Sequence, residues 1–198
     1  MKYLANALTV LRIVLTAVLS VFLLSSFSLF SNETTRVFCA VVFLVASITD
    51  FLDGAIARGA NVVTDFGKFL DPVADKLLVL STFICLAVSP LTDAVIRPLL
   101  AATAVILLFR ELSVTSLRML AASRGLVLAA RGAGKIKTFV QCITVLWIFL
   151  EPMLVAEGHL VSYILLALCI LCTVYSGLSF AFAWKKVMQN AEQEGSKE

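Results

Sequence analysis

Residues 50–75 of the chain read DFLDGAIARGANVVTDFGKFLDPVAD, with four aspartates inside a strongly apolar part of the sequence. Helical residues three or four apart share a face, so Asp50 and Asp53 align on one helix, and Asp71 and Asp75 align on the next. A carboxylate at membrane depth is costly unless a partner compensates its charge, and divalent cations are the simplest such partners. The stretch therefore predicts two helices that present four carboxylates to a metal site.

The composition predicts that this stretch lies in a membrane. Hydrophobic residues make up 61% of the 198 residues and charged residues only 15%. Apolar stretches long enough to span a bilayer fall at about residues 5–30, 35–57, 70–90, 94–121, 134–154 and 159–184. We therefore expect an all-α, polytopic membrane protein with six transmembrane helices. The connections are short, so residues 1–184 should form a single transmembrane domain and residues 185–198 a polar cytoplasmic tail.

Basic residues are distributed unevenly between the two ends of these helices. Fourteen lysines and arginines fall on the side of the termini and of the loops near 58–69 and 122–137, against Arg36 and Arg97 on the other side. Some of the fourteen lie inside helices, but the loop residues alone show the same bias. Because cytoplasmic loops carry the excess of basic residues, both termini are expected in the cytoplasm, and the aspartates should open toward it.

Two interpretations other than catalysis stay open for the aspartates. They could form ion pairs with Arg58, Lys68 and Lys76, or they could line a proton or cation pathway in a transporter. Ion pairing needs no glycines and does not require four acids at helical spacing. A transporter usually shows a duplicated half and helix breaks at midplane, and neither is evident.

Small residues and an arginine accompany the acids, which favours an enzyme. Gly54 and Ala57 would leave a flat helix surface for a bulky nucleotide, and Gly67 would clear the facing wall. Arg58 can offer planar, forked donors to a diphosphate. Acids, metal, diphosphate and arginine then belong to one site.

The pattern D-x2-D-G-x2-A-R-x8-G-x3-D-x3-D, complete from Asp50 to Asp75, resembles the signature of the CDP-alcohol phosphotransferases. The resemblance implies a six-helix membrane enzyme, often a homodimer, that moves a substituted phosphoryl group from a CDP-linked donor to an alcohol and releases CMP. It implies dependence on Mg²⁺ or Mn²⁺, with two ions held by Asp50, Asp53, Asp71 and Asp75. By the family's pattern, Asp75 is also the candidate general base that takes the proton from the acceptor hydroxyl.

Further segments resemble the members of this family that join CDP-diacylglycerol to sn-glycerol 3-phosphate in a bacterial cell membrane. These segments are 6–12, 65–76, 110–111 and 134–138. By this resemblance, the residues expected to contact CDP-diacylglycerol are Asn6, Thr9, Gly54, Ala57, Arg58 and Gly67. Thr9 and Arg12 share a helix face with Asn6, and they either line the nucleotide cavity or snorkel to the interface.

A surplus of cations between residues 110 and 137 predicts the site for a phosphorylated acceptor. Arg110 and Arg118 are eight residues apart and therefore share one stripe of a helix. Lys135 and Lys137 begin the next helix, where free backbone N–H groups attract phosphate. The competing interpretation is a patch for lipid headgroups. Sister acceptors, namely serine, inositol phosphate or phosphatidylglycerol, also stay open.

His159 is the only histidine, and it follows a Glu-Gly pair between two apolar stretches. We expect a surface or interfacial residue, because the sequence offers no second histidine and no nearby carboxylate pair to complete a metal or general-base site.

Overall fold

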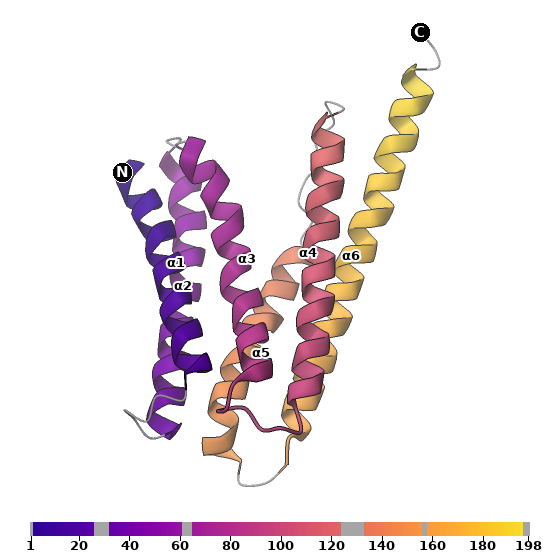
Figure 1. Cartoon of the computed structure of the whole chain (residues 1–198). Helices are drawn as coiled ribbons and strands as arrows, with labels where there is room; N and C mark the ends of the chain where they lie inside the picture. The colour runs from indigo at the N-terminus through magenta and orange to yellow at the C-terminus, as the bar shows by residue number, and fades with distance from the viewer. Residues whose placement is uncertain (1, 26–31, 61–64, 124–132, 156–157, 196–198) are drawn as a thin grey trace.

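The computed structural model describes the backbone of residues 2–25, 32–60, 65–123, 133–155 and 158–195. Side chains are described within these ranges except at residues 2–6, 8, 50–60, 65–73, 75, 133, 186 and 188–195. Six helices make up nearly all of the described backbone (Figure 1). They are α1 (Lys2–Leu24), α2 (Asn32–Ala60), α3 (Asp65–Val88), α4 (Arg97–Ser123), α5 (Ala133–Leu154) and α6 (Leu160–Gly195). The prediction of an all-α fold is confirmed.

Four of the helices are long and apolar enough to cross a membrane. Their apolar segments are Asn32–Thr49 in α2, Arg97–Ser123 in α4, Gly134–Leu154 in α5 and Leu160–Lys185 in α6. The apolar segments Thr9–Leu24 of α1 and Lys76–Val88 of α3 are shorter. Six spans and cytoplasmic termini therefore stay predictions, although both termini lie at the same end of the bundle (Figure 1). The single domain followed by a polar tail also stays a prediction, and α6 continues as a helix to Gly195.

The outer surface of the bundle is apolar. Phe109, Leu160 and Phe182 are each more than two-thirds exposed, at 73%, 72% and 71%. A water-soluble bundle would bury most such side chains, because large contiguous apolar surfaces are rare on soluble monomers. The surface is therefore suited to contact lipid tails rather than water.

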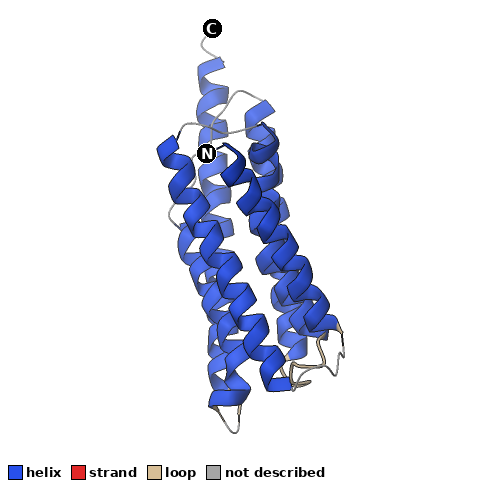
Figure 2. Ribbon diagram, turned by 90° about the vertical axis from the view of Figure 1, so that its left-hand side faces the viewer, coloured by secondary structure: helices blue, strands red, loops and turns tan. Residues whose placement is uncertain are grey.

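The helices form two groups that meet along the middle of the bundle (Figures 1 and 2). In the first group, α1 packs against α2 and α3; in the second, α6 packs against α4 and α5. The groups are joined where α2 packs on α5 and α3 packs on α4. Phe43 of α2 and Phe149 of α5 meet across this junction with ring centroids 6.4 Å apart. Both rings are fully buried, and large aromatic side chains contribute strongly to packing.

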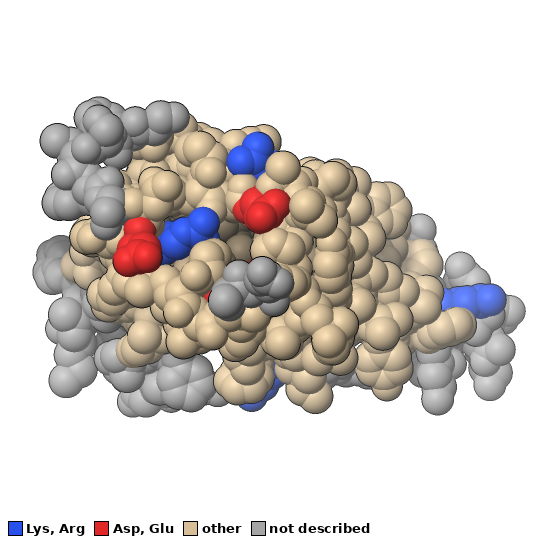
Figure 3. Space-filling model, turned by 90° about the horizontal axis from the view of Figure 1, so that it is seen from below, with Lys and Arg blue, Asp and Glu red and all other residues tan. Residues whose placement is uncertain are grey.

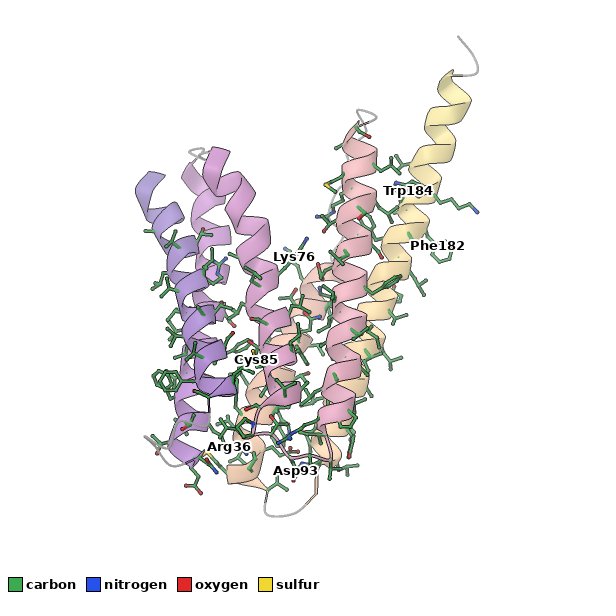
Figure 4. All side chains as sticks on the ribbon, in the orientation of Figure 1. Arg36, Lys76, Cys85, Asp93, Phe182 and Trp184 are labelled. Carbon is green, nitrogen blue, oxygen red and sulfur yellow. The ribbon has the colours of Figure 1, made fainter. Side chains whose placement is uncertain are left out.

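The loop between α3 and α4 ties several helices together at the end of the bundle opposite the termini. Ser89 donates a hydrogen bond from Oγ to the Leu23 carbonyl at the end of α1, at 2.6 Å. The Arg36 guanidinium of α2 donates to the Leu91 carbonyl in the same loop. Figure 4 shows Arg36 and Asp93 at this end, and Figure 3 shows acidic and basic side chains close together on its face.

His159 lies between two carboxylates at this end. Its Nδ1 is 3.0 Å from Glu151 Oε2 and its Nε2 is 3.4 Å from Asp93 Oδ2. The prediction that no carboxylate pair lies near His159 is wrong. Asp93 comes from a loop far upstream in the chain, and such a contact is invisible in sequence spacing. Among the described side chains no group of three or more His, Cys, Asp or Glu could hold a metal ion.

The charge on His159 predicts a pH-dependent stability. The hydrogen bond with Glu151, assisted by Asp93, raises the pKa of the His159 imidazole above its ordinary value. A raised pKa contributes stability that is fully present below the ordinary value of about 6.5 and is lost as pH rises through the folded-state value. The melting temperature of purified protein should therefore fall as pH rises above about 6.5.

The matched variant for this measurement is His159→Gln, which keeps a polar side chain but cannot titrate. Its melting temperature should change less over the same pH range. Parallel curves for the two proteins would contradict a stabilising charge on His159.

Candidate active site

The backbone brings the two aspartate pairs to the same depth in the bundle. α2 ends at Ala60 and α3 begins at Asp65, so the two helices turn back on each other after a short connection, and they pack together. Asp50 and Asp53 lie seven to ten residues before the end of α2, and Asp71 and Asp75 lie six to ten residues after the start of α3. With a rise of 1.5 Å per residue, all four lie about 9–15 Å from the connected helix ends.

The side chains of the signature residues lie outside the described part of the structure. Their assignments as metal ligands, base and nucleotide contacts therefore stay predictions. The residues concerned are Asn6, Asp50, Asp53, Gly54, Ala57, Arg58, Gly67, Asp71 and Asp75. What the structure adds is the helical backbone on which each of them sits.

Thr9 and Arg12 lie on the buried face of α1. Both side chains are 2% exposed, and α1 packs only against α2 and α3 among the described helices. Counted from Lys2, they lie about 10–15 Å along α1 from the end where the α2–α3 connection also lies. This is the depth of the aspartates. Burial against α2 and α3 favours the nucleotide-cavity interpretation of Thr9 and Arg12 over snorkelling to the interface.

A polar pocket opens between α3, α4 and α5, one turn deeper on α3 than the last aspartate. The pocket is small and partly open to solvent, with a cavity volume of about 40 Å³. Its walls are apolar on α3 and α4 except for Lys76 and Glu111, and they are mostly polar on α5. The lining residues are Lys76, Val79, Leu80, Leu107, Glu111, Lys137, Thr138 and Gln141. Apolar walls with a few convergent polar groups are the kind of lining that small-molecule sites have.

Lys76 enters the pocket from α3. Its ammonium donates a hydrogen bond to the Thr115 hydroxyl of α4, with Nζ and Oγ1 2.6 Å apart. Figure 4 shows the side chain between α3 and α4. This hydrogen bond gives Lys76 a neutral partner on α4. The ion-pairing interpretation stays a prediction, because the side chains of the four aspartates lie outside the described part of the structure.

Glu111 gathers two cations on one oxygen. Its Oε1 accepts a hydrogen bond from Arg110 Nη1 at 2.8 Å and another from the Lys137 ammonium of α5. The side chains of Arg110 and Glu111 are each 15% exposed, and that of Lys137 is 9% exposed. Charges removed from water to this extent need partners with good geometry, and Glu111 supplies one for both cations.

Arg110 and Arg118 share a stripe of α4, as the spacing predicts, but this stripe faces α6. Arg110 Nη2 donates to Ser176 Oγ at 2.8 Å, and the Arg118 guanidinium lies 5.4 Å from the centre of the Phe180 ring. Ser176 and Phe180 are one turn apart on α6, so the two arginines contact successive turns. Neither arginine lines the described pocket, whereas the neighbouring stripe with Glu111 and Thr115 faces it.

Lys135 and Lys137 are also separated by the structure. Lys137 is buried and lines the pocket, whereas Lys135 is exposed and does not. Residues two positions apart on a helix, such as these lysines, point in directions about 200° apart, so only one of them can face a given cavity.

Besides Thr138, sequence reasoning missed four polar residues of the pocket region. Gln141 donates from Nε2 to the Thr173 hydroxyl of α6 at 3.4 Å and is only 3% exposed. Lys76, Glu111 and Thr115 complete the set. A signal was present, because Glu111 and Thr115 are four apart in an apolar helix, where polar residues face the interior. Their partners on other helices could not be read from that spacing.

Removing the Glu111 charge should destabilise the protein. Glu111→Gln leaves the partly buried Arg110 and Lys137 without their shared carboxylate. Removal of one partner from a buried ion pair lowers the stability by more than the intact pair contributes, because the remaining charge is buried without a partner. We expect a loss of about 1–3 kcal/mol in the free energy of unfolding, visible as a lower melting temperature. The matched control is Glu33→Gln, which removes an exposed carboxylate at the far end of the bundle. Equal melting temperatures for Glu111→Gln and the wild type would contradict the role of Glu111 as a shared partner.

The fold and the site together define a helical membrane protein whose charged pocket adjoins a helix pair with four aspartates. The family model described as CDP-alcohol phosphatidyltransferase matches residues 2–186. The chain belongs to this family. The prediction of an enzyme of the CDP-alcohol phosphotransferase family is confirmed, and with its long apolar helices the chain is a multi-pass membrane protein.

Curated relatives cover most of the chain. A Mycobacterium tuberculosis protein named "Probable phosphatidylglycerophosphate synthase" is 38% identical over 178 residues, which cover 89% of this chain and 79% of that protein. A Bacillus subtilis protein named "CDP-diacylglycerol--glycerol-3-phosphate 3-phosphatidyltransferase" is 39% identical over 149 residues, or 72% of this chain and 74% of that protein. A Rickettsia felis protein of the same name is 34% identical over 187 residues, or 93% and 97%.

Proposed function

We propose that this chain transfers a phosphatidyl group from CDP-diacylglycerol to sn-glycerol 3-phosphate, giving phosphatidylglycerophosphate and CMP. The observation that carries the proposal is the cationic pocket between α3, α4 and α5, beside the helices that hold the four aspartates. The names of the relatives support the choice of donor and acceptor.

The charge of the pocket fits a phosphorylated acceptor. Among the described side chains in and around it, Lys76, Lys137 and Arg110 face a single carboxylate, Glu111. Because Arg110 faces α6, the lining itself carries two lysines against one carboxylate, an excess of one positive charge, whereas a phosphate monoester carries about −1.5 to −2 at neutral pH. A neutral acceptor would leave Lys76 without an anionic partner among the described side chains. Arg118 and Lys135 do not line the pocket, and they are proposed to attract the anionic acceptor as it approaches the pocket.

The donor is proposed to bind between α1, α2 and α3. Buried Thr9, with Arg12 beside it, faces the helix pair that holds the signature residues. Gly54, Ala57 and Gly67 would leave room for the nucleotide, Asn6 would border it, and Arg58 would hold the diphosphate. The acyl chains would stay in lipid, and the apolar outer surface accommodates them.

The aspartates are proposed to hold the divalent cations that this family generally uses. Asp50, Asp53, Asp71 and Asp75 form a donor set of oxygens only, which suits Mg²⁺ or Mn²⁺, and the backbone sets all four at one depth. Bound cations would offset the negative charge of the diphosphate during transfer. Two ions are expected for four carboxylates.

Asp75 is proposed to act as the general base. Its carboxylate would take the proton from the glycerol 1-hydroxyl, whose oxygen then forms a bond to the β-phosphorus of CDP-diacylglycerol. The bond between that phosphorus and the bridging oxygen breaks, and CMP leaves with the electron pair. Lys76 directly follows Asp75 on α3 and lines the pocket, so an acceptor bound there would lie against the helix that carries the proposed base.

The setting we propose is a bacterial cell membrane, with six spans, both termini in the cytoplasm and an active site that opens to the cytoplasm. The common end of the two termini and the basic bias on their side support this orientation. A homodimer is proposed from the family resemblance, because the apolar outer surface could contact either lipid or a second copy.

The proposal is tested by turnover of purified protein with labelled CDP-diacylglycerol and one acceptor at a time. The acceptors are glycerol 3-phosphate, serine, inositol phosphate and phosphatidylglycerol, each with Mg²⁺ or Mn²⁺. CMP release with glycerol 3-phosphate alone is the expected result. CMP release with another of these compounds would show that this compound, and not glycerol 3-phosphate, is the acceptor. Ion flux into proteoliposomes without CMP release would contradict the proposed enzymatic function and favour a transporter.

A further inference from the structure

Lys76 is a charged residue of the pocket. It belongs neither to the aspartate signature nor to the cations that the sequence predicts to bind the acceptor. It lies on α3 directly after the candidate base, and it lines the pocket together with Val79 and Leu80. An ammonium group has three donors, and one of them goes to the Thr115 hydroxyl at 2.6 Å. Among the described residues, no carboxylate pairs with it. Its charge is therefore not neutralised by the contacts that the structure describes.

Thr115 gives this ammonium a fixed position. The hydroxyl lies on α4, one turn from Glu111, so both residues face the same side of the helix. Lysine has a long, flexible side chain, and an unheld ammonium in an apolar segment would reach for water. The Lys76–Thr115 hydrogen bond instead keeps the charge between α3 and α4.

The opposite wall of the pocket carries the second lysine. Lys137 enters from α5 and shares its charge with Glu111, while Thr138 and Gln141 add neutral polar groups to the same wall. An anion in this pocket would thus meet one lysine from α3 and one from α5. Lys137 is already paired with a carboxylate, so Lys76 is the stronger attraction for the anion.

We propose that Lys76, held by Thr115, is the residue that binds the phosphate group of the acceptor and so places its hydroxyl beside Asp75. The inference rests on the proposed function and adds a binding residue that faces the pocket, where Arg110 and Arg118 face α6. Binding of the anion on α3 itself ties the acceptor to the helix that carries the base. The other phosphate source would be the diphosphate of the donor, and the kinetics below separate the two.

Steady-state kinetics of Lys76→Met tests the proposal, since methionine keeps the length and apolar stem of the side chain without its charge. The KM for glycerol 3-phosphate should rise roughly 10- to 100-fold, the usual loss for a hydrogen bond to a charged group. The KM for CDP-diacylglycerol should change less than about 3-fold. Lys76→Arg should recover part of the loss. A raised KM for CDP-diacylglycerol with an unchanged KM for glycerol 3-phosphate would assign Lys76 to the donor and overturn the proposal.

Thr115→Val tests the positioning part. It removes the hydroxyl but keeps the shape, so the KM for glycerol 3-phosphate should rise roughly 3- to 10-fold. In the Lys76→Met background the same change should have no further effect, because the hydrogen bond is already gone. Additive effects of the two substitutions would overturn the positioning role. Lys185→Met, which removes an exposed lysine of α6, is the matched control and should leave both KM values unchanged.

A binding measurement separates this inference from the proposed function. Inorganic phosphate should raise the melting temperature of the purified wild type, and this stabilisation should be lost in Lys76→Met but kept in Lys185→Met. If the wild type releases no CMP with glycerol 3-phosphate, the proposed function fails while the phosphate measurement still decides the role of Lys76. Equal stabilisation of the wild type and Lys76→Met by phosphate would overturn it.

Discussion

Asp75→Asn should lower kcat by roughly 10²- to 10⁴-fold, the usual contribution of a general base. Asparagine has nearly the same shape and can still accept hydrogen bonds, but it cannot take the proton from the acceptor hydroxyl. The measurement is CMP release under saturating CDP-diacylglycerol and glycerol 3-phosphate. The rate should not recover at high pH, because an amide gains no basicity there.

Two controls accompany this variant. Glu33→Gln removes a carboxylate from an exposed position at the far end of α2, and its kcat should equal that of the wild type. The melting temperature of Asp75→Asn should stay close to that of the wild type, so that loss of activity is not loss of fold. A kcat within a few-fold of the wild type would remove Asp75 from the proposed chemistry.

Removal of divalent cations should have an effect of similar size. After chelation the rate should fall by at least about 100-fold, because a metal ion offsets several kcal/mol of charge on a transferring phosphoryl group. Mg²⁺ or Mn²⁺ should restore it. Asp50 and Asp53 on α2, with Asp71 and Asp75 on α3, are the proposed ligands at one depth of the bundle.

A second readout tests the metal site without turnover. Added Mg²⁺ or Mn²⁺ should raise the melting temperature of the chelated wild type, since a ligand that binds only the folded state stabilises it. Asp53→Asn should shrink this increase, whereas Glu33→Gln should keep it in full. Full activity in the presence of chelator, or an undiminished increase for Asp53→Asn, would speak against the four-carboxylate site.

The sequence was most informative about elements and about the signature. Long apolar stretches mark α2, α4, α5 and α6, because a bilayer demands length and composition of a spanning helix. The helical spacing of Asp50, Asp53, Asp71 and Asp75 placed two pairs on two consecutive helices, and the structure has those helices. Local rules govern both features, so no knowledge of helix packing was needed.

The pocket depended on packing and was predicted only in part. Lys137 was anticipated from the surplus of cations, but its partner Glu111 lies on α4, and Lys76 meets Thr115 across the gap between α3 and α4. The rotation of α4 about its own axis determines which of its residues face the pocket. With Arg110 and Arg118 turned to α6, the neighbouring stripe with Glu111 and Thr115 turns toward α3 and α5, and an α-helical pattern alone does not say which stripe meets which helix.

The loop between α3 and α4 has a mechanical consequence for a lipid-handling enzyme. Through Ser89 and Leu91 it fastens α1 and α2 at one end, while the Asp93–His159–Glu151 contacts fasten α5 and the start of α6 there. Helices that are held together at one end separate most easily at the opposite end. The termini and the connected ends of α2 and α3 lie at that other end (Figure 1). A two-chain lipid could thus be admitted and released there by spreading helices, without undoing the contacts that keep the bundle together.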